Sequence, residues 1–222
     1  MDFLIYFEGR IKMSVDHYLN EEYDIKKRFS SYWHQINEIL SLNSKEILEI
    51  GIGGGIVSNY LRVRGKKITT LDIDNNLGPD VVGSVVETPF SKESFDVVAC
   101  YEVLEHLPFE HFFPTLLELN RISRTYVILS LPDRTGRAYR LNIQFPKFGE
   151  VKKLITLPRL KPIRWEFDGV HYWEVGTQGY AVNRIISHIQ KAGFKVRNNY
   201  RVFEYPYHRL FVLEKCLSDK AN

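Results

Sequence analysis

Apolar positions along the chain follow two different periods, and these periods predict helices in some segments and strands in others. Residues 22–41 place Tyr23, Phe29, Trp33, Ile36 and Leu40 at spacings of three, four or multiples of these, which predicts an amphipathic helix. From residue 46 to residue 132, strand-like and helical runs alternate, and the strand-like runs are mainly apolar rather than alternating between apolar and polar. Such strands are typical of a parallel sheet covered by helices on both faces.

Element by element, the pattern predicts one α/β domain. Strands are expected at 46–50, 67–73, 81–82, 95–100 and 125–131, and helices at 56–64, from Pro108 onward and at 178–192. Two further runs, 194–204 and 209–215, are joined across Pro206 and predict an antiparallel hairpin. The expected fold is a Rossmann-like, doubly wound, seven-stranded and mostly parallel sheet with a C-terminal antiparallel hairpin.

Within this single domain, four parts are expected. They are an N-terminal extension and cap helix (1–45), a core with the glycine-rich loop (46–132), an aperiodic segment rich in aromatic and basic residues (133–176), and a final helix with the hairpin (177–222). The length of 222 residues fits one domain that buries enough surface to need no disulfide. Cys100 and Cys216 lie far apart and lack a zinc-ligand spacing, so we expect no metal site.

No targeting signal is expected from the N-terminal sequence. The apolar run at the start of the chain is broken by Glu8, unlike a signal peptide, and no stretch of about 18 apolar residues occurs. A cytoplasmic protein is therefore the expectation. Translation from Met1 and from Met13 both remain open.

A glycine-rich loop follows the first expected core strand and precedes a helix. It places Glu49, Gly51, Gly53 and Gly55 at every second position, and glycine there lets the backbone approach a ligand closely. The loop lacks the Lys-Ser/Thr pair of a phosphate-binding P-loop. It matches the dinucleotide fingerprint imperfectly, because Ile56 stands where the third glycine belongs.

The motif acid-x-Gly-x-Gly-x-Gly resembles that of class I methyltransferases that use S-adenosylmethionine, in particular their type 11-like branch. Asp72 ends the next strand at the distance expected for a ribose-binding carboxylate, and the stretch PFSKESFDVVACYEVLEHLP, which ends at Pro108, resembles that branch as well. The resemblance covers residues 46–132 well and 171–215 loosely.

The resemblance implies S-adenosyl-L-methionine as cofactor and a set of contacts to it. The loop amides and Glu49 are expected near its methionine end with Glu102, Asp72 at the ribose and Ile73 beside the adenine. Ser84 and Val85 are expected at the adenine edge, where many relatives have Asp in place of Ser84. The implied cofactor-binding residues are Glu49, Gly51, Gly53, Gly55, Asp72, Ile73, Ser84, Val85 and Glu102. Asp74 competes with Asp72 for the ribose, and Asp72 is also a possible helix N-cap.

Two histidines are candidate catalytic bases. The segment 168–176 resembles a turn before the last helix of these methyltransferases, and its His171 is suited to take a proton from an acceptor. The alternative is that residues 171–173 only pack that helix onto the sheet. His106 is the second candidate, with a solvated helix start as its alternative. On the first helix, Trp33 and His34 are placed to close over the donor, or Trp33 packs in the core.

The net charge of +3 is the sum of two unequal parts. Residues 134–164 carry nine bases and one acid, hence +8, whereas the rest of the chain carries 21 bases and 26 acids, hence −5. We expect this basic segment to cover the acceptor site and to bind an anionic acceptor. RNA, a membrane surface at Phe148–Leu157 and a merely solvated face are the alternatives.

The sequence therefore predicts a methyltransferase that uses S-adenosylmethionine, with a small or anionic acceptor that the residues do not identify. A nicotinamide-dependent oxidoreductase is one alternative. A non-catalytic adenosyl-binding module with a basic interaction surface is the other. The oligomeric state stays open.

Overall fold

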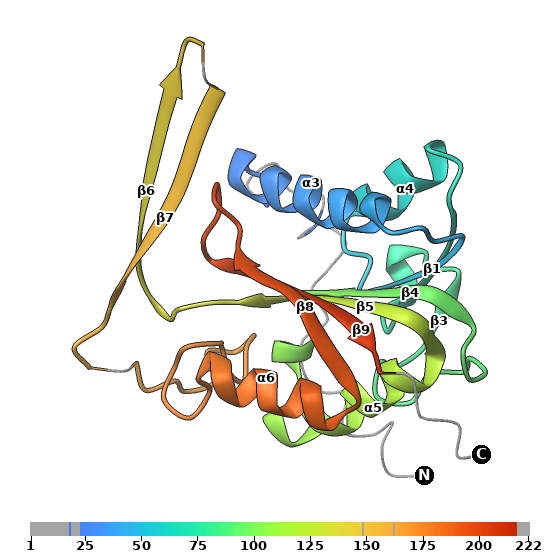
Figure 1. The fold of residues 1–222 in the computed structure, drawn as a ribbon. Helices are drawn as coiled ribbons and strands as arrows, with labels where there is room; N and C mark the ends of the chain where they lie inside the picture. The colour runs from blue at the N-terminus through green and yellow to red at the C-terminus, as the bar shows by residue number, and fades with distance from the viewer. Residues whose placement is uncertain (1–17, 19–22, 148, 162, 217–222) are drawn as a thin grey trace, which may run out of the picture.

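A seven-stranded sheet forms the centre of the molecule in the computed structural model, which describes residues 18, 23–147, 149–161 and 163–216 (Figure 1). Its strand order is β3-β2-β1-β4-β5-β9-β8. The strands are β1 (Glu46–Ile50), β2 (Lys67–Asp72), β3 (Val81–Val82), β4 (Phe95–Tyr101), β5 (Ser123–Pro132), β8 (Phe194–Arg201) and β9 (His208–Lys215). β1 to β5 run parallel, and β9 is antiparallel to both β5 and β8. The predicted sheet and its C-terminal hairpin are confirmed.

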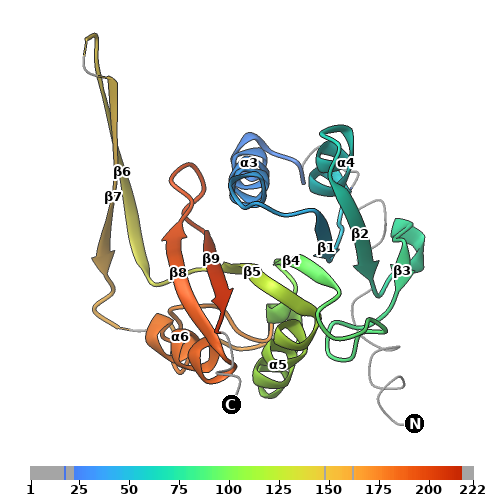
Figure 2. The same cartoon turned by 45° about the vertical axis from the view of Figure 1, so that its right-hand side comes forward.

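Helices cover both faces of the sheet. Figure 2 shows α3 (Lys26–Ser41) and α4 (Ile56–Val63) on one face, with α5 (Phe112–Ile122) and α6 (Val182–Lys191) on the other. Short 3-10 turns occur at Asn75–Leu77, Leu104–His106 and Phe109–His111. Pro108 precedes the last of these turns, so α5 begins four residues later than the position of that proline suggests.

The helices on both faces of the sheet explain why its strands are mainly apolar. In β4, Val97 and Ala99 point into the cluster beneath α3 and α4, whereas Val98 and Cys100 point into the cluster beneath α5 and α6, and all four are fully buried. A strand that is buried on both sides is apolar over most of its length.

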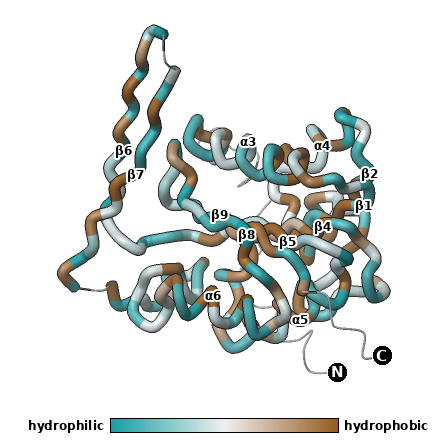
Figure 3. Tube along the Cα trace, viewed as in Figure 1, coloured by the Kyte–Doolittle hydropathy of each residue, from teal (hydrophilic) through white to brown (hydrophobic). Residues whose placement is uncertain are grey.

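The segment 133–176 is not aperiodic, which corrects the sequence-based expectation. It contains a ten-residue strand, β6 (Gly136–Phe145), paired antiparallel with a second one, β7 (Gly149–Pro158), in a hairpin that projects from the body (Figures 1 and 2). Figure 3 shows hydrophobic and hydrophilic stretches along this hairpin. From Tyr139 to Phe145 its residues alternate between apolar and polar, which is the pattern of a strand with two different faces. Among the described residues, no helix has the length and apolar character needed to cross a membrane.

Candidate active site

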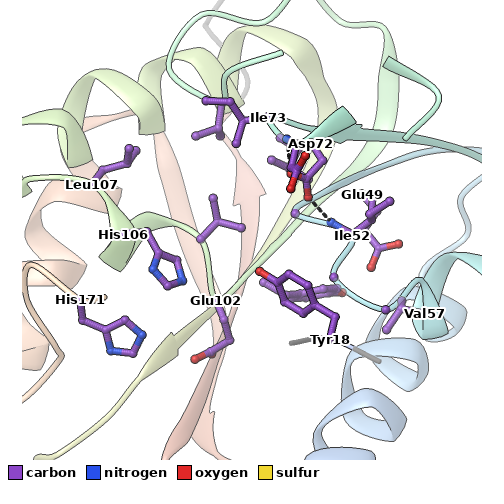
Figure 4. Close-up of a pocket in the computed structure, with 18 of the residues that line it drawn as sticks. Tyr18, Glu49, Ile52, Val57, Asp72, Ile73, Glu102, His106, Leu107 and His171 are labelled. Atoms are coloured by element: carbon purple, nitrogen blue, oxygen red, sulfur yellow. Dashed lines mark hydrogen bonds between the residues drawn. The ribbon is translucent and has the colours of Figure 1, made fainter. Parts of the chain in front are cut away.

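A cavity of about 810 Å³ opens at the carboxyl ends of β1, β2 and β4 (Figure 4). This volume is typical of small-molecule sites. Side chains from the glycine loop, β2, the end of β4, α3 and the segment before α6 line it. Because the carboxyl ends of parallel strands meet at one edge of the sheet, residues predicted from separate motifs come together there.

The glycine loop lines one side of the cavity. Gly51 has a φ of +78°, and a Cβ atom on it would lie 2.3 Å from Cγ2 of Val103, so no larger residue fits. Gly51 and Gly53 line the cavity, whereas Gly55, the N-cap residue of α4, lines a smaller space of about 240 Å³ that shares the loop. As a glycine, Gly55 contributes no capping side chain to the amides of the first turn of α4.

Asp72 is held at the end of β2 by the backbone. Its Oδ2 accepts a hydrogen bond from the amide of Ile52 at 3.0 Å, and its Oδ1 accepts one from the amide of Asp74 at 2.9 Å (Figure 4). Each carboxylate oxygen has a second lone pair for a ligand hydroxyl. Asp74 also lines the cavity, but its Oδ1 accepts from the backbone and side-chain amides of Asn76, so it caps the turn that follows β2.

Glu49 lies buried beside the glycine loop, and only 2% of its surface is exposed. Its Oε2 has no hydrogen-bond partner among the residues that the structure describes. Burial raises the pKa of this carboxyl group to about 8, although hydrogen bonds from Ser58 oppose the shift. A buried carboxyl group with an unused oxygen at the cavity is suited to receive a cation.

The three residues expected around an adenine also line the cavity. Ile73 is half exposed and follows Asp72, while Ser84 and Val85 lie past β3. The hydroxyl oxygen of Ser84 accepts a hydrogen bond from the amide of Val86 at 3.2 Å. Ser84 can still donate its proton to a ligand nitrogen, as the missing Asp cannot when ionised.

Glu102 lies at the turn that follows β4, in a backbone conformation that few residues other than glycine adopt, with φ at +51°. Its amide donates to the carbonyl of Ser130 at 3.0 Å, and the Ser130 hydroxyl donates to its Oε1. His208 Nε2 lies 3.6 Å from its Oε2. Burial raises the pKa of Glu102 to about 7, against the hydrogen bond from Ser130.

His171 forms a pair with a buried carboxylate that the sequence analysis did not single out. Its Nδ1 lies 2.9 Å from Oε1 of Glu174, which is fully buried. The Tyr207 hydroxyl donates to the same oxygen, and Arg134 donates to Oε2. Because a carboxylate accepts, Nδ1 carries a proton, and in the neutral imidazole Nε2 is then the nitrogen with the lone pair.

His106 faces the cavity beside His171, with 5.0 Å between the ring centroids (Figure 4). Its Nδ1 lies 3.1 Å from the carbonyl oxygen of Val170, which only accepts, so its Nε2 also carries a lone pair. Burial, and then the neighbouring His171, lower the pKa of His106 to about 4. Its ring is therefore neutral at pH 7.

The packing alternative for residues 171–173 holds for one of them. Trp173 is fully buried, and its Nε1 donates to the carbonyl of Leu107 at 3.1 Å. His171 and Tyr172, in contrast, line the cavity. Trp173 thus packs this turn into the core, whereas His171 lies at the cavity.

A further set of possible ligand atoms includes two residues that line the cavity, His106 and His171, and one that does not, Glu105. Glu105, His106 and His171 each offer one atom within 4.8 Å of the others. Glu105 is fully buried, neither of its oxygens has a hydrogen-bond partner among the described residues, and burial raises its pKa. Such nitrogen and oxygen donors are suited to divalent cations.

The face of α3 that reaches the cavity differs from the one expected. Arg28, Tyr32 and Gln35, spaced four and three residues apart, line the cavity. Trp33 is 61% exposed, and His34 pairs with Glu204 at 3.0 Å, so the idea that these two close over the donor, or that Trp33 packs in the core, is wrong. Polar residues at helical spacing were a usable signal for the correct face.

The basic segment does not cover the cavity. Of the described residues between 133 and 176, only His171 and Tyr172 line it, and Arg28 is the one Lys or Arg among all described lining residues. Five Asp or Glu residues share that lining: Glu49, Asp72, Asp74, Glu102 and Glu110. The basic side chains of the described segment therefore do not line the cavity, and an anionic acceptor stays a prediction that this lining does not support.

Known proteins share the sequence of the region that forms the cavity. Residues 48–129 match the Methyltransf_11 family model, described as "Methyltransferase domain". The chain is similar to the ubiquinone biosynthesis O-methyltransferases of Rickettsia bellii strain OSU 85-389 (27% identical over 132 residues, 54% of this chain and 52% of the relative) and Rickettsia felis (31% over 135 residues, 55% and 52%). It spans about half the length of these curated relatives.

Solved structures share the fold over most of the chain. A protein from Pyrococcus horikoshii OT3 aligns with a TM-score of 0.59 at 14% identity, covering 89% of this chain and 93% of its own. The 1,6-didemethyltoxoflavin-N1-methyltransferase of Burkholderia thailandensis, with 1,6-didemethyltoxoflavin and S-adenosylhomocysteine bound, aligns with a TM-score of 0.57 at 14% identity, covering 86% and 78%. At such identities the likeness shows the fold.

Proposed function

We propose that this chain, which carries a methyltransferase domain of the Methyltransf_11 family, transfers a methyl group from S-adenosylmethionine to an oxygen atom of a small-molecule acceptor. One observation carries the proposal. The glycine loop and the two carboxyl groups at its side share a cavity with the carboxylate-anchored imidazole of His171. The groups that suit the methyl donor and the imidazole that suits proton removal thus line the same cavity.

The residues on the donor side fit S-adenosylmethionine. The unused Oε2 of Glu49 suits the ammonium group, the remaining lone pairs of Asp72 suit the ribose hydroxyls, and the absence of a Cβ on Gly51 gives the backbone close approach. When bound, the donor supplies a methyl group on a sulfonium, which leaves as a neutral thioether. The chain then has to position an acceptor in line with that methyl group, with reacting atoms about 3–3.5 Å apart.

His171 is the group that we assign as the base. As the acceptor oxygen forms its bond to the methyl carbon, the acceptor hydroxyl loses its proton to Nε2 of His171, and Glu174 stabilises the resulting imidazolium through Nδ1. His106 lies next to it as a second neutral imidazole. The names of the Rickettsia relatives, O-methyltransferases, support oxygen as the acceptor atom.

Two alternatives are less well supported. A nicotinamide-dependent oxidoreductase needs a glycine where Ile56 begins α4. A non-catalytic adenosyl-binding module has no use for an imidazole held by a buried carboxylate at the cavity, whereas a methyltransferase does.

Calorimetry separates the methyltransferase from the nicotinamide-dependent oxidoreductase. S-adenosylhomocysteine should bind to the purified chain and NADH should not, and preferential binding of NADH would overturn the proposal. Transfer of a labelled methyl group into fractionated cell extract then tests the reaction itself. Label in the small-molecule fraction, as an ether, is the expected result, and label only in protein or RNA would show that the acceptor class is wrong.

A further inference from the structure

Most of the large apolar residues of the β6–β7 hairpin lie on one face, whereas Leu154 lies on the other face, opposite Arg140. The strand register sets Ile143 opposite Val151 and Tyr139 opposite Ile155, and directly paired residues project to the same side of a sheet. Seven large apolar side chains on this face are 40–51% exposed: Tyr139, Leu141, Ile143, Phe145, Val151, Ile155 and Leu157. We call this set the apolar face of the hairpin.

The opposite face of the hairpin is the one that contacts the body. Arg140 donates from Nη1 to the carbonyl of Glu204 at 2.9 Å, and Nζ of Lys152 lies 3.5 Å from Oε1 of the same residue. Asn142 and Glu150 pair with each other on that face. The mostly polar face, which also carries the half-buried Leu154, is thus turned to the protein, and the apolar face is turned away from it.

An exposed apolar patch of this kind marks a binding surface in soluble proteins. An isolated two-stranded hairpin is only marginally stable, and this one keeps ten residue pairs in register with little burial. A partner on the apolar face would remove these side chains from water.

Positive charge surrounds the apolar face. Between residues 136 and 161 the chain carries seven bases and one acid, hence +6. Arg137 and Lys153 lie on the apolar face itself, at register positions opposite Leu157 and Leu141. We propose that the β6–β7 hairpin is a membrane-docking element whose apolar face inserts among the headgroups of anionic lipids, with its lysines and arginines paired to lipid phosphates.

The composition of the face favours lipid over the other two partners. RNA binding relies on aromatic rings for base stacking, whereas five of the seven apolar residues are aliphatic. In a second copy of the chain, the same face would bring Arg137 and Lys153 close to identical charges. Anionic lipid satisfies both the aliphatic side chains and the cations.

Vesicle co-sedimentation tests the proposal with the full chain and without donor or acceptor, so its outcome does not depend on the methyltransferase reaction. We expect binding to vesicles of phosphatidylcholine mixed with phosphatidylglycerol, weaker binding in high salt, and little binding to phosphatidylcholine alone. Absence of binding to the anionic vesicles would overturn the proposal.

Two matched triple variants assign the binding to a face. L141S/I143S/I155S on the apolar face should lower the partition coefficient roughly tenfold or more, because three inserted side chains are lost. N142S/Q144S/T156S on the other face should leave it within about twofold of the parent chain. Equal losses in both variants would show that the hairpin docks by a different surface.

Two further measurements exclude the other partners and a folding defect. Both variants should bind S-adenosylhomocysteine as the parent chain does, since described hairpin residues do not line the cavity. Light scattering in solution and binding to single-stranded RNA should be unchanged by L141S/I143S/I155S. A dimer that this variant dissociates, or RNA binding that it abolishes, would assign the face to that partner and overturn the lipid proposal.

Discussion

Nδ1 of His171 lies 2.9 Å from Oε1 of Glu174, three residues further along the chain. Glu174 is fully buried and takes additional hydrogen bonds from Tyr207 and Arg134. The carboxylate fixes the tautomer and the orientation of the ring, so the basic nitrogen is the one left for the acceptor.

This pair predicts the effect of removing the base. His171→Ala should lower kcat by about 10²–10⁴-fold, the usual share of a general base, and leave the affinity for S-adenosylhomocysteine unchanged. Glu174→Gln should lower kcat less and shift its pH profile, because the ring loses the carboxylate that stabilises its charge. A normal kcat in His171→Ala would show that His106 is the base or that the reaction uses no base from the protein.

The ribose contact is tested at Asp72. Asp72→Asn keeps the size of the side chain but removes its charge, and the loss of charge-assisted hydrogen bonds should weaken donor binding by about 2 kcal/mol in calorimetry. Asp74→Asn is the matched control two residues away, and it should change donor affinity less because Asp74 caps a turn. The reverse order of effects would assign the ribose to Asp74.

Donor binding should release a proton from Glu49. The pKa of this carboxyl is about 8 in the ligand-free protein because of burial, so it is protonated at pH 6.5, and an ammonium group at Oε2 favours the ionised form. Calorimetry at pH 6.5 in buffers of different ionisation enthalpy should reveal the release, and affinity should rise as the pH approaches 8. Glu49→Gln should abolish both effects. Proton release that persists in this variant would come from another group.

Acid should remove the contribution that the buried, neutral His208 makes to the stability of the ligand-free protein. Burial lowers the pKa of His208 to about 3 from its usual value near 6.5, so between these values the unfolded chain binds the proton and the folded one does not. This contribution to stability is therefore complete above pH 6.5 and is lost as the pH drops below it, whereas the raised pKa values of Glu49 and Glu102 act in the opposite direction. In thermal unfolding from pH 7 to pH 4, the parent chain should lose stability relative to His208→Gln, and the same pH dependence in both would show that His208 does not contribute.

The glycine loop offers a test with a closely matched control. Gly51→Ala places a methyl group against Val103 at a positive φ, so both stability and donor affinity should fall, stability by about 1–3 kcal/mol. Gly65→Ala has a nearly equal φ of +76° but open space around the new atom. It should cost less stability and leave donor binding intact. If the two variants bind the donor equally well, close backbone approach at Gly51 is not needed.

Much of the donor side was predictable because it depends on local sequence. Strand, glycine loop and helix follow each other directly, and a carboxylate at the end of the next strand must lie at the same sheet edge. The structure places Gly51, Asp72, Ser84 and Glu102 around one cavity, as that rule requires. Whether each contacts the donor stays a prediction.

The base side was less predictable, since it depends on residues far apart in the chain. Glu174 is held by Arg134, 40 positions earlier, and by Tyr207, 33 positions later. No residue spacing in the sequence predicts this hydrogen-bond network. The face of α3 that meets the cavity is likewise set by where the helix lies on the sheet.

The sequence by itself determined the order of elements, the doubly wound sheet and the glycine loop with its acidic partners, because hydrophobic period and glycine content act locally. It also located the +8 segment from 134 to 164. Only the tertiary structure decided where those charges go. Arg134 turns inward to Glu174, whereas β6 and β7 pair with each other and project from the body. The hairpin contacts the body at Glu204 through Arg140 and Lys152, and a count of charges in the sequence does not predict these contacts.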